Sequence, residues 1–268
     1  MKAVTLGPAG TYSHRAASAV VDEVTFRESV TSIVEAVAKG EVERGVIPVE
    51  NSIEGSVTES LDALTEYEVA VVREVVTPIR HALLAQSEDF QTVASHSQAL
   101  AQCRSFLENE YPSVQLEAVA STARGVEQAR EDATVAAIGH PDNAHNGLTV
   151  LAEDIQDWDS NETRFFVIAP VAEREDGGGK TSVVIYPNTD YPGLLLELLQ
   201  AFADRDINLT RIESRPSGTR LGDYLFHIDF AAGLYEGRTK QALTAVEEII
   251  ADDGFVRRLG SYDIQHVV

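Results

Sequence analysis

The chain has 268 residues, of which 44% are apolar and 24% charged, so it can fill a hydrophobic core, and a mainly disordered chain is excluded. It carries 43 acidic residues against 21 basic ones, and the net charge of −22 would repel a nucleic-acid backbone. No run of about 18 apolar residues predicts a membrane span, and one cysteine, Cys103, excludes an intramolecular disulfide and a multi-cysteine zinc site.

The acidic residues are spread over the whole chain. Up to Glu173 there are 28 acidic and 11 basic residues, and the remainder has 15 and 10. Such a coat is well screened near 1 M salt, where the Debye length is about 3 Å. We therefore expect a salt-rich cytosol, since the first residues also lack the longer apolar core of a secretion signal.

The first 173 residues alternate short apolar runs with helical patterns. The predicted strands are Ala3–Leu6, Arg44–Val49, Val69–Val76, Thr92–Ala94, Val114–Ala120, Val135–Ile138 and Phe165–Ile168. The predicted helices are Ile53–Leu64, Ser97–Leu107 and Thr122–Ala129. This alternation predicts an α/β fold with substantially parallel sheet, and such sheets bind ligands beyond the carboxyl ends of their strands.

A charged, glycine-rich segment separates two domains. Residues 173–179 read Glu-Arg-Glu-Asp-Gly-Gly-Gly, and three consecutive glycines hold neither a helix nor a strand at low cost. We predict domains over residues 1–173 and 180–268, joined by a linker over 174–179.

The second domain reads as β-α-β-β-α-β. Its predicted elements are strands Thr181–Tyr186, Asn208–Ile212, Tyr224–Phe230 and Phe255–Val267, with helices Tyr191–Ala203 and Arg238–Ala251. Apolar and polar residues alternate along Tyr224–Phe230, as expected of a strand with one buried face. This order predicts a ferredoxin-like sandwich.

In four junctions of the first domain a strand gives way to a helix through small polar residues. They are Gly7–Ser13, Glu50–Ser52, Ser95–Gln98 and Ser121–Thr122. Free amides at a helix start attract anions, and hydroxyl or amide side chains add directed donors. The alternative for each junction is ordinary helix capping. Together the four favour an anion-binding crevice.

Several single residues allow two interpretations. His96 could be a general base or a local hydrogen-bonding residue at a helix start, and Cys103 fits a buried, inert position better than a nucleophile. Gln98 and Gln102 share one helix face. Arg164 is either a surface charge beside nearby acids, such as Asp157 and Asp159, or the fork that takes a ligand carboxylate. No Ser-His-Asp signature, Walker loop or dinucleotide fingerprint occurs.

Longer motifs resemble one known family over essentially the whole chain. They are GPAGTYSHRAA (7–17), PVENSIEGSVTESLD (48–62), SHSQALAQC (95–103), the Ser121–Ala123 turn, NETRFF (161–166) and YPGLLLELLQAFADRDINLTRIESRP (191–216). The chain is identified as a member of the monofunctional prephenate dehydratases, which carry a C-terminal ACT domain. The resemblance implies a two-lobed catalytic domain like a periplasmic binding protein.

The resemblance also implies an activity: prephenate loses water and carbon dioxide to give phenylpyruvate, with no metal or organic cofactor. Thr163 matches the family's central catalytic hydroxyl, and Asn51, Ser95 and Gln102 match positions implicated in catalysis or substrate binding. We expect the substrate carboxylates to meet Arg164 and the helix starts that carry the polar residues Thr11, Ser13, Ser52, Ser121 and Thr122.

The second domain resembles the phenylalanine-sensing ACT domain. The matching positions are Gly193, Leu194, Asn208, Leu209, Glu213, Ser214 and Arg215, with Leu194 where the family commonly has alanine. Because such effector pockets lie between paired ACT domains, the resemblance implies a homodimer or homotetramer inhibited by phenylalanine, through a change in lobe closure.

Three other functions are compatible with parts of the sequence or are excluded by it. The enzyme could act on arogenate, which has an ammonium where prephenate has a keto group, and no single residue decides between the two. A non-catalytic amino-acid sensor would close on its ligand without forming product. The acidic coat argues against a nucleic-acid-binding regulator.

Overall fold

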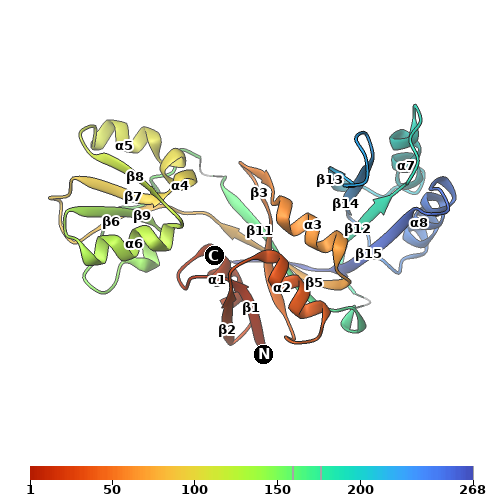
Figure 1. Ribbon diagram of the computed structural model, residues 1–268, viewed down its shortest axis with the longest axis horizontal. Coiled ribbons are helices and arrows are strands. Elements are labelled where there is room, and N and C mark those ends of the chain that lie inside the picture. Colours follow the sequence, from red (N-terminus) through yellow and green to blue (C-terminus); the bar gives the residue numbers. More distant parts are fainter. Residues whose placement is uncertain (159, 176, 268) are drawn as a thin grey trace.

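Three β-sheets follow one another along the long axis of the molecule (Figure 1). The computed structural model describes residues 1–158, 160–175 and 177–267. Two sheets form the lobes of the first domain, and the third belongs to the second domain. Asp159, Asp176 of the predicted linker and Val268 at the predicted end of the second domain lie outside the described residues.

Lobe one contains both ends of the described chain. Its sheet has the order β16-β5-β11-β3-β1-β2, with β4 paired to β3. The strands are β1 (Lys2–Leu6), β2 (Glu23–Arg27), β3 (Gly45–Asn51), β4 (Gly55–Ser56), β5 (Val69–Pro78), β11 (Glu162–Pro170) and β16 (Ile264–His266). The helices are α1 (Tyr12–Ser18), α2 (Val30–Ala38) and α3 (Thr58–Glu66). Buried apolar side chains of α2 and α3 fill the space against the sheet.

Lobe two is inserted between β5 and β11. Its sheet has the order β10-β6-β9-β7-β8. The elements are β6 (Ala82–Ala85), β7 (Thr92–His96), α4 (Ser97–Gln102), α5 (Arg104–Glu110), β8 (Gln115–Val119), α6 (Thr122–Glu131), β9 (Val135–Gly139) and β10 (Thr149–Ala152). The chain therefore crosses between the lobes twice, after β5 and before β11.

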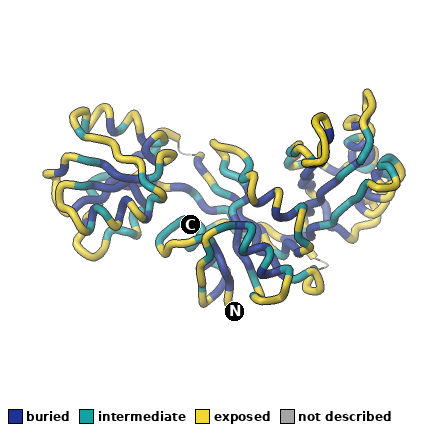
Figure 2. The backbone as a smooth tube through the Cα atoms, in the orientation of Figure 1, coloured by how far each residue is buried: buried dark blue, intermediate teal, exposed yellow. Residues whose placement is uncertain are grey.

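The second domain has the predicted β-α-β-β-α-β order. It contains β12 (Lys180–Tyr186), α7 (Leu194–Ala203), β13 (Leu209–Pro216), β14 (Tyr224–Phe230), α8 (Gly237–Ile249) and β15 (Phe255–Tyr262), with sheet order β13-β14-β12-β15. One sheet face packs on α7 and α8. The other continues the core of lobe one through Val184, Leu225, Leu259 and Tyr262. Figure 2 shows the buried backbone running through this junction.

Tertiary structure corrects two predicted helices. The helix predicted over Ile53–Leu64 begins only at Thr58, because the chain first turns back to pair β4 with β3. The helix predicted over Ser97–Leu107 is split at Cys103 into α4 and α5. In addition, β2, α2, β6 and β10 were not predicted as elements.

The last strand predicted, Phe255–Val267, is two strands in two sheets. β15 closes the second-domain sheet, and β16 then pairs in parallel with β5 of lobe one. A Cβ on Gly260 would collide with the Val71 carbonyl, so a glycine lets β15 pass close over β5. The end of the second domain is thus part of the lobe-one sheet. No helix among the described residues is long and apolar enough to cross a membrane.

Candidate active site

A cavity of about 560 Å³ lies between the two lobes. It falls within the size range of small-molecule sites. Side chains from both lobes and from the first crossing segment line it: Leu6, Thr11, Tyr12, Ser13, Asn51, Glu54, Gly55, Ser56, Val57, Ile79, His81, His96, Gln98, Ala99, Gln102, Ala120, Ser121, Thr122 and Thr163. Three of the four predicted catalytic residues, Asn51, Gln102 and Thr163, are therefore on this cavity.

Thr163 and Asn51 meet because β11 pairs with β3. Their Cα atoms are partners in the antiparallel ladder, and Asn51 Nδ2 donates to Thr163 Oγ1 at 3.0 Å. The tight turn after β3 holds the other end of the amide, since Asn51 Oδ1 accepts the backbone N–H groups of Ile53 and Glu54 at 3.0 and 3.1 Å. The Asn51 side chain is thus fixed at both ends.

Two further side chains, His81 and Asn161, extend this arrangement into lobe two. Asn161 Oδ1 accepts from Asn51 Nδ2 at 2.8 Å, and Asn161 Nδ2 donates to Gln102 Oε1 at 3.0 Å. The same Gln102 oxygen lies 2.9 Å from His81 Nε2. Burial lowers the pKa of His81, so the ring is neutral near pH 7.

Sequence reasoning assigned no role to His81 or Asn161. A signal existed for Asn161, because it stands two residues before Thr163, and alternate residues of an extended segment share a face. No comparable local signal marks His81, which reaches Gln102 only through the packing of lobe two.

Ser95 does not line the cavity. It is fully buried in β7, and its hydroxyl donates to the Ile138 carbonyl of β9 at 2.7 Å. The structure therefore gives this side chain a contact between strands and does not bring it to Thr163. Cys103 is also buried, and burial raises the pKa of its thiol, which fits the inert position predicted.

The predicted helix-start residues divide into two groups. Thr11, Ser13, Ser121 and Thr122 line the cavity, whereas Ser52 does not. Thr11 Oγ1 accepts from His14 N and Ser121 Oγ accepts from Arg124 N, so both hydroxyls cap helices as the capping interpretation predicts. The Ser52 hydroxyl donates to the Ser160 carbonyl and so binds β3 to the second crossing segment.

The charge of the cavity is unusual for a site that would take an anion. Among the described residues, its lining includes no lysine and no arginine, and Glu54 is the one carboxylate there. Burial raises the pKa of Glu54, which opposes its ionisation. Positive potential at this site therefore comes from helix N-termini and neutral donors rather than from cationic side chains.

The position predicted for Arg164 is corrected by the structure. Its side chain leaves β11 on the side opposite to Thr163 and is buried against the second domain. The guanidinium is 2.7 Å from Asp229 of β14, 3.0 Å from Glu74 and 3.3 Å from Glu50. Three carboxylates thus occupy the fork that was expected to bind substrate.

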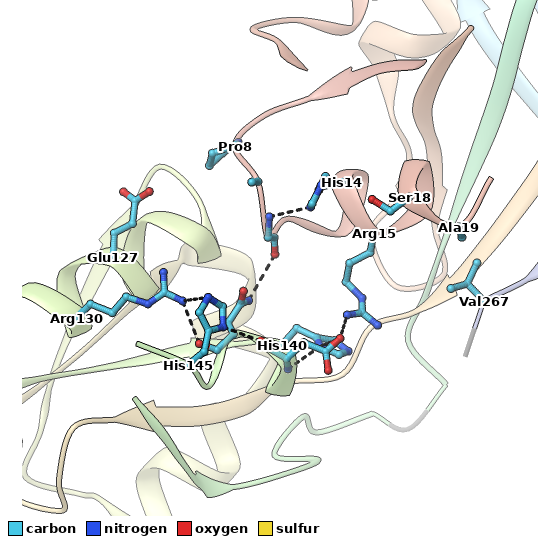
Figure 3. A pocket seen from close by; sticks show the side chains of 14 residues that line it. Pro8, His14, Arg15, Ser18, Ala19, Glu127, Arg130, His140, His145 and Val267 are labelled. Atoms are coloured by element: carbon cyan, nitrogen blue, oxygen red, sulfur yellow. Dashed lines mark hydrogen bonds and ion pairs between the residues drawn. The ribbon is translucent and has the colours of Figure 1, made fainter. Parts of the chain in front are cut away.

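A second cavity, of about 720 Å³, lies beside the Gly7–Ser13 loop (Figure 3). Its polar groups contact one another: Arg15 pairs with Asp142, and Arg130 donates to His145 Nε2 at 3.1 Å. Burial, with Arg15 nearby, lowers the pKa of His140 to about 4. No predicted catalytic residue lines this cavity, although it is larger, and its Arg15–Asp142 pair is a contact between the lobes.

The predicted effector residues do not gather in one pocket of a single chain. Leu194 is buried in the core of the second domain. Glu213 accepts from the Ser56 hydroxyl at 3.0 Å and Arg215 pairs with Asp62 at 3.0 Å, so both contact lobe one. Gly193, Asn208, Leu209 and Ser214 lie at or near α7 and the edge strand β13.

Two family descriptions match the chain. "Prephenate dehydratase" covers residues 3–173, and "ACT domain" covers residues 188–248. The first match spans the two lobes and the interlobe cavity, and the second spans most of the ferredoxin-like domain.

Three curated relatives and one solved structure are similar over nearly the full chain. The bifunctional chorismate mutase/prephenate dehydratase of Aquifex aeolicus is 39% identical over 98% of this chain and 73% of its own length. The prephenate dehydratase of Methanocaldococcus jannaschii is 36% identical over 96% of both chains. Arogenate dehydratase/prephenate dehydratase 2 of Arabidopsis thaliana is 38% identical over 96% of this chain and 71% of its own length. The crystal structure of prephenate dehydratase in complex with L-Phe from Arthrobacter aurescens superposes with a TM-score of 0.89 at 35% identity, covering 98% and 90% of the two chains.

Proposed function

The chain belongs to the prephenate dehydratase family, and on that premise we propose how its interlobe cavity forms phenylpyruvate. It is a hydro-lyase that converts prephenate to phenylpyruvate, carbon dioxide and water, with feedback by phenylalanine. The C–C bond to the ring carboxylate breaks, its electron pair completes the aromatic ring, and the ring hydroxyl leaves. One proton must be taken up for that hydroxyl to depart as water.

Thr163 assists the departing hydroxyl. The observation that carries this assignment is the Asn51 amide donating to Thr163 Oγ1 at 3.0 Å on the wall of the cavity. A threonine hydroxyl is a very weak acid, so it stabilises the leaving oxygen by hydrogen bonding and does not act alone as a strong acid. Aromatisation supplies the driving force, and a positioned donor lowers the barrier to C–O cleavage.

Different lining groups are assigned to the two carboxylates of the substrate. Gln102 and the N-termini of α1 and α6 are donors for the carboxylate that is retained. The carboxylate that becomes neutral carbon dioxide is better placed near apolar side chains, such as Leu6, Val57 and Ile79 of the lining. Ser95 supports this wall through β7 and touches no reacting group in this assignment.

Thr163→Val tests the central assignment, because it removes the hydroxyl and keeps the side-chain shape. We expect kcat for phenylpyruvate formation to fall by about 10² or more, the usual scale for a positioned proton donor. Thr163→Ser is the matched control and should keep most of the activity. A Thr163→Val enzyme with near-normal turnover would refute the assignment, and a wild type that binds prephenate without product would favour the sensor alternative.

Phenylalanine regulation is completed by a second copy of the chain. β13 is an edge strand, and Leu195, Leu196 and Ile212 expose apolar surface on and beside it. An uncovered edge of this kind invites pairing with another chain. We infer a homodimer or homotetramer with the effector residues at the interface between two copies of the second domain. Light scattering at micromolar concentration should report an oligomer, and a strict monomer that still responds to phenylalanine would exclude the shared site.

Arogenate is a second candidate substrate, favoured by one observation. Glu54 is the single carboxylate among the described residues of the cavity; in its ionised form it would pair with the ammonium of arogenate and repel the more anionic prephenate. Glu54→Gln should then lower kcat/KM for arogenate and raise it for prephenate. Equal effects on both substrates would leave Glu54 without a part in the choice.

The acidic surface suits work in a salt-rich cytosol. With 43 acidic residues on 268, self-repulsion is large at low ionic strength and is screened when salt is high. We expect the thermal midpoint to rise between 0.1 and 2 M KCl. An unchanged or lower midpoint would contradict a halophilic adaptation.

A further inference from the structure

The side-chain amides between the lobes form one hydrogen-bonded chain whose direction is set at one end. Asn51 Oδ1 accepts the backbone N–H groups of Ile53 and Glu54, so the amide nitrogen must face Asn161 and Thr163. An amide nitrogen only donates. Thr163 Oγ1 therefore accepts from Asn51, and its own proton remains available to a ligand in the cavity.

The hydrogen bonds of Asn161 run in the same donor-to-acceptor direction, from lobe one to lobe two. Its oxygen accepts from Asn51 at 2.8 Å, which leaves its nitrogen to donate to Gln102 Oε1 at 3.0 Å. Gln102 Oε1 is thus an acceptor, and the Gln102 nitrogen is left for a ligand. Since His81 Nε2 lies 2.9 Å from the same oxygen, His81 must carry its proton on that nitrogen.

The location of Asn161 allows its side chain to contact both lobes. It is 1% exposed and lies in the second crossing segment, directly before β11. Its backbone carbonyl accepts from Ile79 N of the first crossing segment at 2.8 Å. One buried side chain between the two crossings therefore contacts a lobe-one amide and a lobe-two amide.

We propose that Asn161 is a positioning residue: it accepts from the fixed Asn51 amide and donates to Gln102, so that Gln102, like Thr163, presents a hydrogen-bond donor to the substrate. The proposal rests on the function proposed above for the cavity. If the Gln102 amide were reversed, its carbonyl oxygen would face a substrate carboxylate, and an attraction would become a repulsion. The direction of the chain therefore matters as much as the presence of its members.

Asn161→Asp tests the direction, because the introduced carboxyl changes its hydrogen bonding with pH. When ionised it accepts only, so Gln102 must turn its nitrogen toward it and its oxygen into the cavity. When protonated it can donate to Gln102 as the asparagine does. Burial raises the pKa of such a carboxyl, which brings the change toward the neutral range.

We expect kcat of Asn161→Asp, divided by the wild-type value at each pH, to be about 10²-fold low at high pH and to recover at least about tenfold as the pH falls. Asn161→Ala cannot titrate and should be about tenfold low at every pH. The titratable groups that the described residues place on the cavity are Tyr12, Glu54, His81 and His96, and the ratio to wild type removes the contributions that the two enzymes share. Asn146→Asp, at an exposed loop residue, is the matched control and should follow the wild type.

A ratio for Asn161→Asp that is constant with pH, or equal to wild type throughout, would overturn the proposal. ¹⁵N NMR of the wild-type histidines gives a second measurement that needs no folded Asn161 variant. The His81 signal, assigned by its loss in His81→Gln, should report a proton on Nε2, and a proton on Nδ1 would overturn the proposal. If the wild type forms no phenylpyruvate, the proposed function fails. The His81 tautomer then still tests the donor-to-acceptor direction of the hydrogen bonds from Asn51 through Asn161 to Gln102.

Discussion

Thr163 and Arg164 follow each other on β11, yet their side chains enter opposite chemical environments. Thr163 faces a cavity in which uncharged amides and hydroxyls are the polar partners. Arg164 faces the second domain and is held by three carboxylates, Asp229 of that domain and Glu50 and Glu74 of lobe one. The paired strand β3 repeats the division, with Asn51 on the cavity and Glu50 beside Arg164. One pair of strands thus carries both the donors that we propose act on the substrate and the joint to the second domain.

The cavity side and the second-domain side of the β3–β11 pair differ in how their buried polar groups are paired. On the cavity side, neutral amides hydrogen-bond one another, and no net charge is buried among them. On the joint, Arg164, Lys180 and Arg211 are balanced by Glu50, Glu74 and Asp229, all within ion-pair distance of a partner in this cluster. A buried ion cluster is sensitive to the loss of any one member, because the charge left behind has no solvent to stabilise it. The joint should therefore be the more fragile side.

Arg164→Met should show this fragility most strongly. It leaves the buried Asp229 without its ion-pair partner and Glu74 with Lys180 alone, and removing one member of a buried pair costs about 3–5 kcal/mol. Urea unfolding measures the loss. The matched control is Arg80→Met, which breaks a pair with Asp154 that is about half exposed on both sides and should cost less than about 1 kcal/mol. Similar losses in the two variants would contradict the comparison.

Arg211→Met tests whether the joint communicates with the cavity. Arg211 Nη2 donates to the Ser56 hydroxyl at 2.6 Å, and Ser56 lines the cavity. We expect the phenylalanine concentration for half inhibition to change by about tenfold, within the usual range of coupling energies. Arg257→Met is the control, because Arg257 also crosses the joint but donates to the carbonyls of Leu64, Thr65 and Tyr67. A larger shift in the control would show that contact with the cavity wall is not what matters.

The sequence predicted the fold classes well because they depend on local patterns. Alternation of strands and helices, and the one-sided apolar pattern of Tyr224–Phe230, were enough for the α/β domain and the βαββαβ domain. β16 could not be predicted as a strand of lobe one, because Ile-Gln-His has no strand pattern of its own and its partner β5 lies about 190 residues earlier. The break at Cys103 is likewise tertiary, since the apolar spacing runs through it.

The candidate site was predicted in part. Asn51, Gln102 and Thr163 were expected on the cavity and line it. Arg164 could have been excluded, because successive residues of a strand point to opposite faces and Thr163 already faces the cleft. Ser95 could not have been excluded in this way, since its burial depends on β9 lying beside β7.

Substitution of His227 should give the smallest change in stability, and it tests how the joint depends on pH. It lies on β14 at the joint, 3.1 Å from Thr65 Oγ1, with Arg211, Arg215 and Asp229 as its charged neighbours. Burial, followed by the nearby arginines, lowers its pKa from 6.5 to about 3. As the pH falls below about 6.5, the unfolded chain binds a proton that the folded chain rejects, so stability is lost over the window from 6.5 toward 3. Urea unfolding should show His227→Gln losing about 1 kcal/mol less than wild type between pH 6.5 and 5.5, and equal losses would mean that His227 is already protonated in the folded joint.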